Sequence, residues 1–311
     1  MFSLFERVKS GAGLMGIALQ AFVTFPSLIV PLLVCWAVYA PVVIYQKYSL
    51  DWSAYSLGGR LGILFATILL FSVVISFSCL TLLTTVRQIE TKGRPNVAVA
   101  VGVALFNTVR ALPIAVLWAV IWFLLAVLEA LFSRKREEDG APEFSVEDVA
   151  KTLAGFDSWS FSGAFFRALQ KGVRMLAFLI FPALLWEHDS TIQSIKRGLA
   201  VAHAHRVEFF TGFALTEFFS AIVFLPPLIL FLLSGKLHIE FPDWVWIATI
   251  IYIGFAWSLS ILMEQLFTAE LYLWHLNWEK ARKEAHRTGA KLPKLRDVKR
   301  PSLTDGIPDM A

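Results

Sequence analysis

Carboxylates inside long apolar runs are the residues of this chain whose types and positions could do chemistry. Glu217 is the only charge in the run 209–233, and Glu264 directly follows the uncharged run 244–263. Glu270 lies further along the same segment. Because an ionised side chain is costly inside hydrocarbon, each must pair with a basic or hydroxyl group, reach the headgroups, or bind a proton or substrate.

Two arginines are the candidates for basic partners of these carboxylates. Arg174 forms a stripe with Arg167 and Lys171 at the helical spacing i, i+4, i+7. Arg110 directly precedes the third apolar run. We expect Glu217 to pair with Arg174, which gives the carboxylate a structural role. A proton or substrate relay is the alternative.

Motifs for metal binding and enzymatic catalysis are absent from the sequence. His203 and His205 are two residues apart, about 200° around a helix, and so cannot share one ion. There is no HExxH, GxSxG, Walker A, GxGxxG or paired CxxC motif. We therefore expect no metal and no cofactor, and a non-enzymatic role is preferred to a membrane-embedded enzyme.

A basic cluster follows the last apolar run. We expect Lys280, Arg282, Lys283 and Arg287 to face anionic phospholipid headgroups. A basic residue close to an acidic membrane surface gains about 1 kcal/mol, and this explanation is preferred to nucleic-acid binding. Residues 279–311 end in a proline-rich, polar stretch and are predicted to form a basic, largely disordered tail in the cytoplasm.

Membrane-spanning helices are the elements that would position these residues. A helix needs roughly 20 apolar residues to cross a hydrocarbon core of about 30 Å. The composition is typical of membrane proteins, with 57% hydrophobic and 17% charged residues and a mean hydropathy of +0.64. The predicted spans are 27–45, 61–85, 111–132, 161–186, 209–233 and 244–263, the last extending somewhat further.

The last three spans have individual features. The uncharged core of the fourth, 175–186, is short, so a re-entrant segment is an alternative to a complete crossing. Pro226 and Pro227 should kink or end the fifth helix. The sixth should continue into the inner interface, because Trp246 and Trp274 would lie about 42 Å apart along a helix.

The sequence thus predicts an all-α fold, a polytopic transmembrane helical bundle of about six spans with short interfacial amphipathic helices. Residues 1–278 would form this membrane domain, with residues 133–160 as a loop on the outside. If the N-terminus is inside, the inside segments hold 18 of the 28 basic residues and the outside segments hold 9. This distribution favours both termini in the cytoplasm.

Two local patterns predict further packing. Residues 95–110 align with residues 191–206 as a weak internal repeat, and each should form a short helix at the inner surface that leads into an outward-going span. Gly58 and Gly62 begin a seam of small residues along the second span. Such a seam allows close helix packing, either within the monomer or in a dimer.

The stretch 181–213 ends one span in an apolar-Pro-apolar-acidic pattern and continues as a basic helix. The residues that fit this pattern are Pro182, Glu187, Lys196, Arg197 and Arg206. In these features it resembles a family of uncharacterised bacterial integral membrane proteins, loosely similar to the membrane domain found beside glycerophosphodiester phosphodiesterases. Residues 86–112 resemble the equivalent earlier unit. The resemblance implies a six-span helical fold and provides no catalytic residues.

The preferred functional hypothesis is a non-enzymatic protein of the bacterial inner membrane that acts as a lipid-interacting scaffold or assembly component. Its expected partners are the lipid bilayer, anionic headgroups, and either another membrane protein or a second copy in a homodimer. A small transporter or channel that uses Glu217 and Glu264 is the alternative. A transporter requires a water-accessible cavity lined by these carboxylates, whereas a scaffold requires a closed bundle with an exposed partner surface.

Overall fold

The computed structural model describes residues 20, 23–134, 161–237 and 239–298. Every regular element within these ranges is helical, as predicted. Five helices are long and apolar enough to cross a membrane, and a bent pair adds a sixth span if its two parts are counted together. The chain is therefore a multi-pass membrane protein with an all-α fold.

The helices follow the predicted spans and extend beyond them. In chain order the elements are η1 (Pro26–Leu28), α2 (Ile29–Tyr48), η2 (Trp52–Ala54), α3 (Leu57–Lys92), α4 (Val97–Arg134), α6 (Phe161–Pro182), η3 (Ala183–Glu187), α7 (Thr191–Ala204), α8 (Arg206–Val223), α9 (Leu225–Leu237), α10 (Asp243–Thr288) and η4 (Leu295–Asp297). The fourth span, formed by α6 and η3, is long enough for a complete crossing. Most of the predicted outside loop lies outside the described residues.

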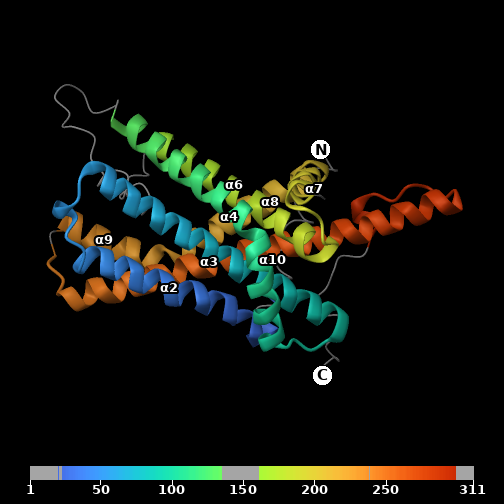
Figure 1. Cartoon of the computed structure of the whole chain (residues 1–311), viewed down its shortest axis with the longest axis horizontal. Coiled ribbons are helices and arrows are strands. Elements are labelled where there is room, and N and C mark those ends of the chain that lie inside the picture. Colours follow the sequence, from blue (N-terminus) through green and yellow to red (C-terminus); the bar gives the residue numbers. More distant parts are fainter. Residues whose placement is uncertain (1–19, 21–22, 135–160, 238, 299–311) are drawn as a thin grey trace.

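Proline bends the fifth span. α8 and α9 meet at Phe224 with an angle of 50° between them. Pro226 and Pro227 follow directly, and a proline ring removes a backbone donor and clashes with the preceding turn. The predicted kink is therefore confirmed. Pro113 lies inside α4, whose first turns run at an angle to the rest of the helix (Figure 1).

α10 is the helix around which most of the others pack. It contacts α2, α3, α6 and α8, and Figure 1 shows it beside α2 and α3 along the bundle. Its approach to α8 requires Gly212, where a Cβ atom would lie 2.0 Å from the ring of Phe267. Gly198 brings α7 onto α6 in the same way, since a Cβ there would lie 2.8 Å from Ile180.

The small-residue seam of α3 is a packing surface along only part of its length. Ser72, Ser76 and Cys79 are buried, as expected where helices approach closely. Gly58 and Gly62, in contrast, face open space: a Cβ atom added to either glycine would have no tertiary neighbour within 4 Å in the described part of the chain. A dimer contact at these two glycines stays a prediction.

Both segments of the predicted repeat are helical, but they join the following span differently. Residues from Val97 onwards are continuous with the rest of α4. α7 is separated from α8 by His205, whose φ of −119° and ψ of 41° interrupt the helix. α7 begins with a capping box formed by Ser190 and Gln193 and lies across the direction of the long helices (Figure 1).

The end of α10 differs from the tail that the sequence predicts. Residues 279–288, assigned to a disordered tail, are the last turns of α10, which projects beyond the bundle (Figure 1). The chain then folds back along this helix. The indole N–H groups of Trp274 and Trp278 donate to the carbonyl oxygens of Val298 and Pro293 at 3.1 and 3.0 Å. Residues 299–311 lie outside the described residues.

Candidate functional site

Four charged side chains from three helices meet inside the bundle, and we call them the ionic quartet. Lys171 and Arg174 belong to α6, Glu217 to α8 and Glu264 to α10. The Arg174 guanidinium donates two hydrogen bonds to the Glu264 carboxylate, at 2.7 and 2.8 Å. Nζ of Lys171 lies 2.7 Å from Oε2 of Glu217 and 3.6 Å from Oε1 of Glu264.

The two carboxylates of the ionic quartet differ sharply in exposure. The side chain of Glu264 is 1% exposed, whereas that of Glu217 is 60% exposed. The quartet contains two cations and two carboxylates and so has no net formal charge. Removing one member would leave a charge without its partner in an apolar environment, which is strongly unfavourable. The quartet therefore fixes how α6, α8 and α10 pack together.

The expected pairing of Glu217 with Arg174 is wrong. Glu217 has a basic partner, but the partner is Lys171, three residues before Arg174. The Lys171 ammonium also lies 5.0 Å from the centre of the Phe213 ring of α8. A planar guanidinium matches both oxygens of one carboxylate, and the buried Glu264 of α10 presents both oxygens to Arg174.

The two remaining intramembrane candidates lie apart from the quartet. Glu270 is completely buried, and neither of its carboxylate oxygens has a hydrogen-bond partner within the described residues. Arg110 donates to the backbone carbonyl of Asp189 at 3.3 Å and to the side-chain oxygen of Asn107 at 3.4 Å. α6 and η3 form one continuous helical segment, which we call the α6 segment. The Asp189 carbonyl follows the C-terminal end of this segment, where a cation complements the helix dipole.

A second cluster of polar side chains lies where the α6 segment ends against α7 and α10. The last turn of this segment is a π-helix that ends at His188, a non-glycine residue with φ of 58°. π-helical turns occur frequently at functional sites. This turn directs Glu187 toward α7 and α10, where its carboxylate accepts hydrogen bonds from Arg197 and from the Tyr272 hydroxyl.

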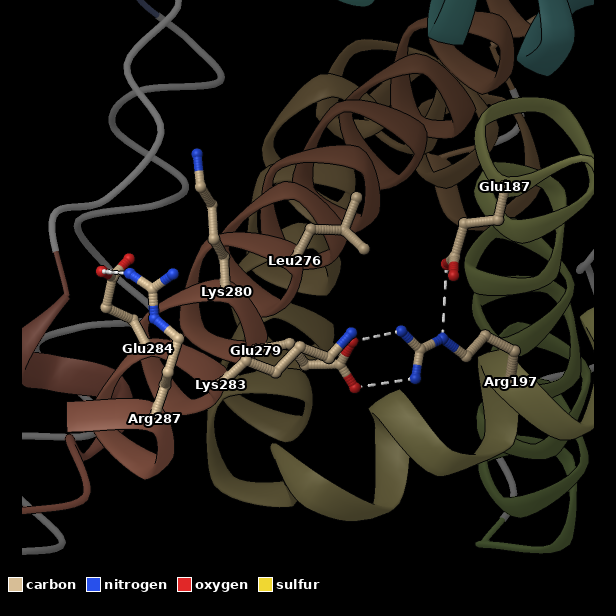
Figure 2. A pocket seen from close by; sticks show the side chains of 8 residues that line it. All are labelled: Glu187, Arg197, Leu276, Glu279, Lys280, Lys283, Glu284 and Arg287. Atoms are coloured by element: carbon tan, nitrogen blue, oxygen red, sulfur yellow. Dashed lines mark hydrogen bonds and ion pairs between the residues drawn. The ribbon is translucent and has the colours of Figure 1, made fainter. Parts of the chain in front are cut away.

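Arg197 of α7 is the centre of this second cluster. Its guanidinium donates to both oxygens of Glu279 at 2.8 and 2.5 Å and to Glu187 at 3.3 Å, so that it lies between the two carboxylates (Figure 2). The hydrogen bonds to Glu279, together with those to Glu187, raise the pKa of Arg197 above its ordinary value. The guanidinium is a permanent charge that joins α6, α7 and α10.

Two histidines extend the cluster into the protein. Nε2 of His205 lies 2.8 Å from Nδ1 of His275, and Nε2 of His275 lies 3.3 Å from Glu279. Both imidazoles are buried, whereas His203 is exposed. In the described part of the chain, no three His, Cys, Asp or Glu side chains are placed to hold a metal ion.

An open groove of about 470 Å³ borders this cluster (Figure 2). Three of the four residues expected to face headgroups, Lys280, Lys283 and Arg287, line it together with Arg197. Figure 2 shows that Lys280 extends away from the ion pairs. The fourth, Arg282, instead lies over the Trp278 ring, 5.4 Å from its centre. Whether these residues contact lipid stays a prediction.

Most of the second cluster was missed by reasoning from the sequence, although one signal was present. Tyr272, His275 and Glu279 follow one another at i, i+3 and i+7 and so share one face of a helix. This polar stripe lies in a segment expected to be interfacial, where polar residues need no special explanation. Its partner Arg197 lies on another helix and could be placed only by tertiary structure.

Comparison with protein-family models, curated proteins and solved structures finds no match to this chain. The resemblance of residues 181–213 to a family of membrane proteins therefore stays a prediction.

Proposed function

We propose that this chain is a non-enzymatic protein of a bacterial inner membrane that binds anionic phospholipid headgroups in the groove between α7 and the end of α10. The observation that carries this proposal is one open groove whose lining includes four basic side chains, Arg197, Lys280, Lys283 and Arg287, beside the three carboxylates of Glu187, Glu279 and Glu284. Such basic side chains beside a membrane span attract acidic lipid.

The position of the groove along α10 supports this function. The uncharged residues 244–263 are enough to cross a hydrocarbon core of about 30 Å. A helix rises about 1.5 Å per residue, which places Lys280 about 9 Å beyond Trp274. Indole side chains favour the membrane interface, so Trp274 marks this interface and the groove would lie on its aqueous side, where long basic side chains can reach lipid phosphates. α7 beside it exposes Ile192 and Leu199, which suits a helix that rests on lipid.

The charges around the groove supply a free donor for a lipid phosphate. Arg197 is bound by Glu187 and Glu279, and Arg287 by Glu284 at 3.1 Å. Among the described residues, the Lys280 ammonium takes part in no ion pair, and the exposed residue points away from the other labelled side chains (Figure 2). An ammonium group is a flexible point charge with three donors. Lys280 would therefore make the first contact with a phosphate.

The ionic quartet supports a scaffold in preference to a transporter. Glu264 is completely buried and bound on both oxygens by Arg174. The groove beside α7 is not lined by Glu217 or Glu264. Neither residue lines a second groove, which lies between the C-terminal end of α2 and the start of α3. Glu264 thus suits a structural role within the bundle. A cytoplasmic groove, with both termini inside, would face the more anionic leaflet.

Thermal unfolding in lipid nanodiscs tests this function. Replacing phosphatidylcholine with phosphatidylglycerol should raise the unfolding temperature of the wild type. The increase should be smaller in K280Q/K283Q and unchanged in K291Q/K294Q, which removes two exposed charges from the segment after α10. Equal losses in both double variants would show that net charge, rather than the groove, determines the lipid effect.

A further inference from the structure

The Lys171 side chain lies between two carboxylates whose surroundings differ. The residue is 5% exposed, and its ammonium is close to Glu217, Glu264 and the Phe213 ring. The charged groups that face Glu217 are Lys171 and Arg174 of α6 and Glu264 of α10. Only Glu217 among them is largely exposed.

The exposed side of Glu217 belongs to an apolar face of α8. Phe210, Phe218 and Ile222 are exposed on this helix, at 66%, 67% and 50%. Positions 210, 217 and 218 lie on the same side of a helix. In a membrane this face meets lipid, where an ionised carboxylate is strongly disfavoured. The Lys171 ammonium donates a hydrogen bond to one oxygen of the Glu217 carboxylate, Oε2.

The two basic residues of the quartet respond differently to such surroundings. An arginine guanidinium keeps its proton in proteins, whereas a lysine ammonium can release its proton to a suitable acceptor. Arg174 holds the fully buried Glu264, and Lys171 holds the lipid-facing Glu217. The inner pair must therefore stay ionic, while the outer pair can become neutral without any change in total charge.

We propose that Lys171 and Glu217 form a proton-exchange pair open to the lipid, in which a proton moves along the 2.7 Å hydrogen bond from Nζ of Lys171 to Oε2 of Glu217. One N–H bond breaks and one O–H bond forms. The ammonium becomes an amine and the carboxylate becomes a carboxylic acid. The Arg174–Glu264 pair keeps its charges. Glu217 is thus a lipid-accessible proton-binding site, a role that goes beyond headgroup binding at the groove.

Labelling with dicyclohexylcarbodiimide in membranes tests this proposal. This apolar reagent adds to a carboxylic acid, whose proton passes to a nitrogen of the carbodiimide, and the adduct rearranges to a stable N-acylurea detected by peptide mass spectrometry. Glu217 should be labelled, and the fully buried Glu264 and Glu270 should not. Labelling of Glu217 by a water-soluble carbodiimide instead would show that this face meets water, and would overturn the proposal.

The variant K171R separates proton exchange from simple exposure. Arginine keeps the charge and the reach of lysine but does not release its proton. Labelling of Glu217 in K171R should fall to the level of Glu264, and labelling equal to that of the wild type would refute the pair. If K171R does not fold, infrared spectroscopy decides between the two outcomes. The wild type should show a carboxylic-acid carbonyl band that E217Q lacks, and identical spectra would contradict the proposal.

Discussion

Replacing Glu264 with glutamine should destabilise the bundle more than any other single change in the ionic quartet. The substitution removes the negative charge and replaces one of the two oxygens that accept hydrogen bonds from Arg174, at 2.7 and 2.8 Å, with an amide nitrogen, which donates. Hydrogen bonds to charged groups contribute about 1.5–3 kcal/mol each. Breaking a buried ion pair by removing one partner costs about 3–5 kcal/mol, so the free energy of unfolding of E264Q should fall by an amount in this range.

A double-mutant cycle with R174Q measures the pairing itself. The unfolding free energies of E264Q, R174Q and the double variant are obtained in detergent by denaturant titration. Because both partners are absent from the double variant, its loss should be smaller than the sum of the single losses by more than about 1 kcal/mol. E284Q breaks the exposed Glu284–Arg287 pair on the same helix and should show no measurable loss. Additive losses in the quartet would refute the reasoning.

Three further predictions concern helix packing, the chain that follows α10, and topology. The variant G212A should lose about 1–3 kcal/mol of stability from overpacking against an aromatic ring, while G62A, which meets open space, should retain its melting temperature. W278F removes the indole donor to the chain after α10, so limited proteolysis should cut residues 289–298 faster, and an unchanged rate would contradict the contact. Cysteines introduced at Ser133 and Ser302 should react with impermeant thiol reagents from opposite sides of the membrane, and labelling from one side would contradict six spans.

The membrane helices could be predicted from the sequence because their signals are local. An apolar run of sufficient length shows a span without knowledge of its neighbours, and Pro226 marks a bend wherever its helix lies. The end of α10 shows the limit of this reasoning. Its polar residues predict disorder, yet Trp274 and Trp278 bind the returning chain, and this contact depends on how residues 289–298 fold back.

The pairing of charges could not be read from the sequence because it depends on three helices at once. Periodicity correctly placed Lys171 and Arg174 on one stripe of α6. It could not show that α8 and α10 both pack against this stripe. Burial then decided the partners, because Glu264 is enclosed and takes the arginine, whereas Glu217 stays exposed and takes the lysine.

Identification of the lipids that stay bound to the intact protein tests the proposed headgroup site most directly. Native mass spectrometry of protein released from nanodiscs that contain equal amounts of phosphatidylglycerol and phosphatidylcholine reports which lipids stay bound. The wild type should retain phosphatidylglycerol in preference to phosphatidylcholine, and K280Q/K283Q should lose this preference while K291Q/K294Q keeps it. Equal retention of both lipids by the wild type, or an unchanged preference in K280Q/K283Q, would contradict headgroup binding in the groove between α7 and α10.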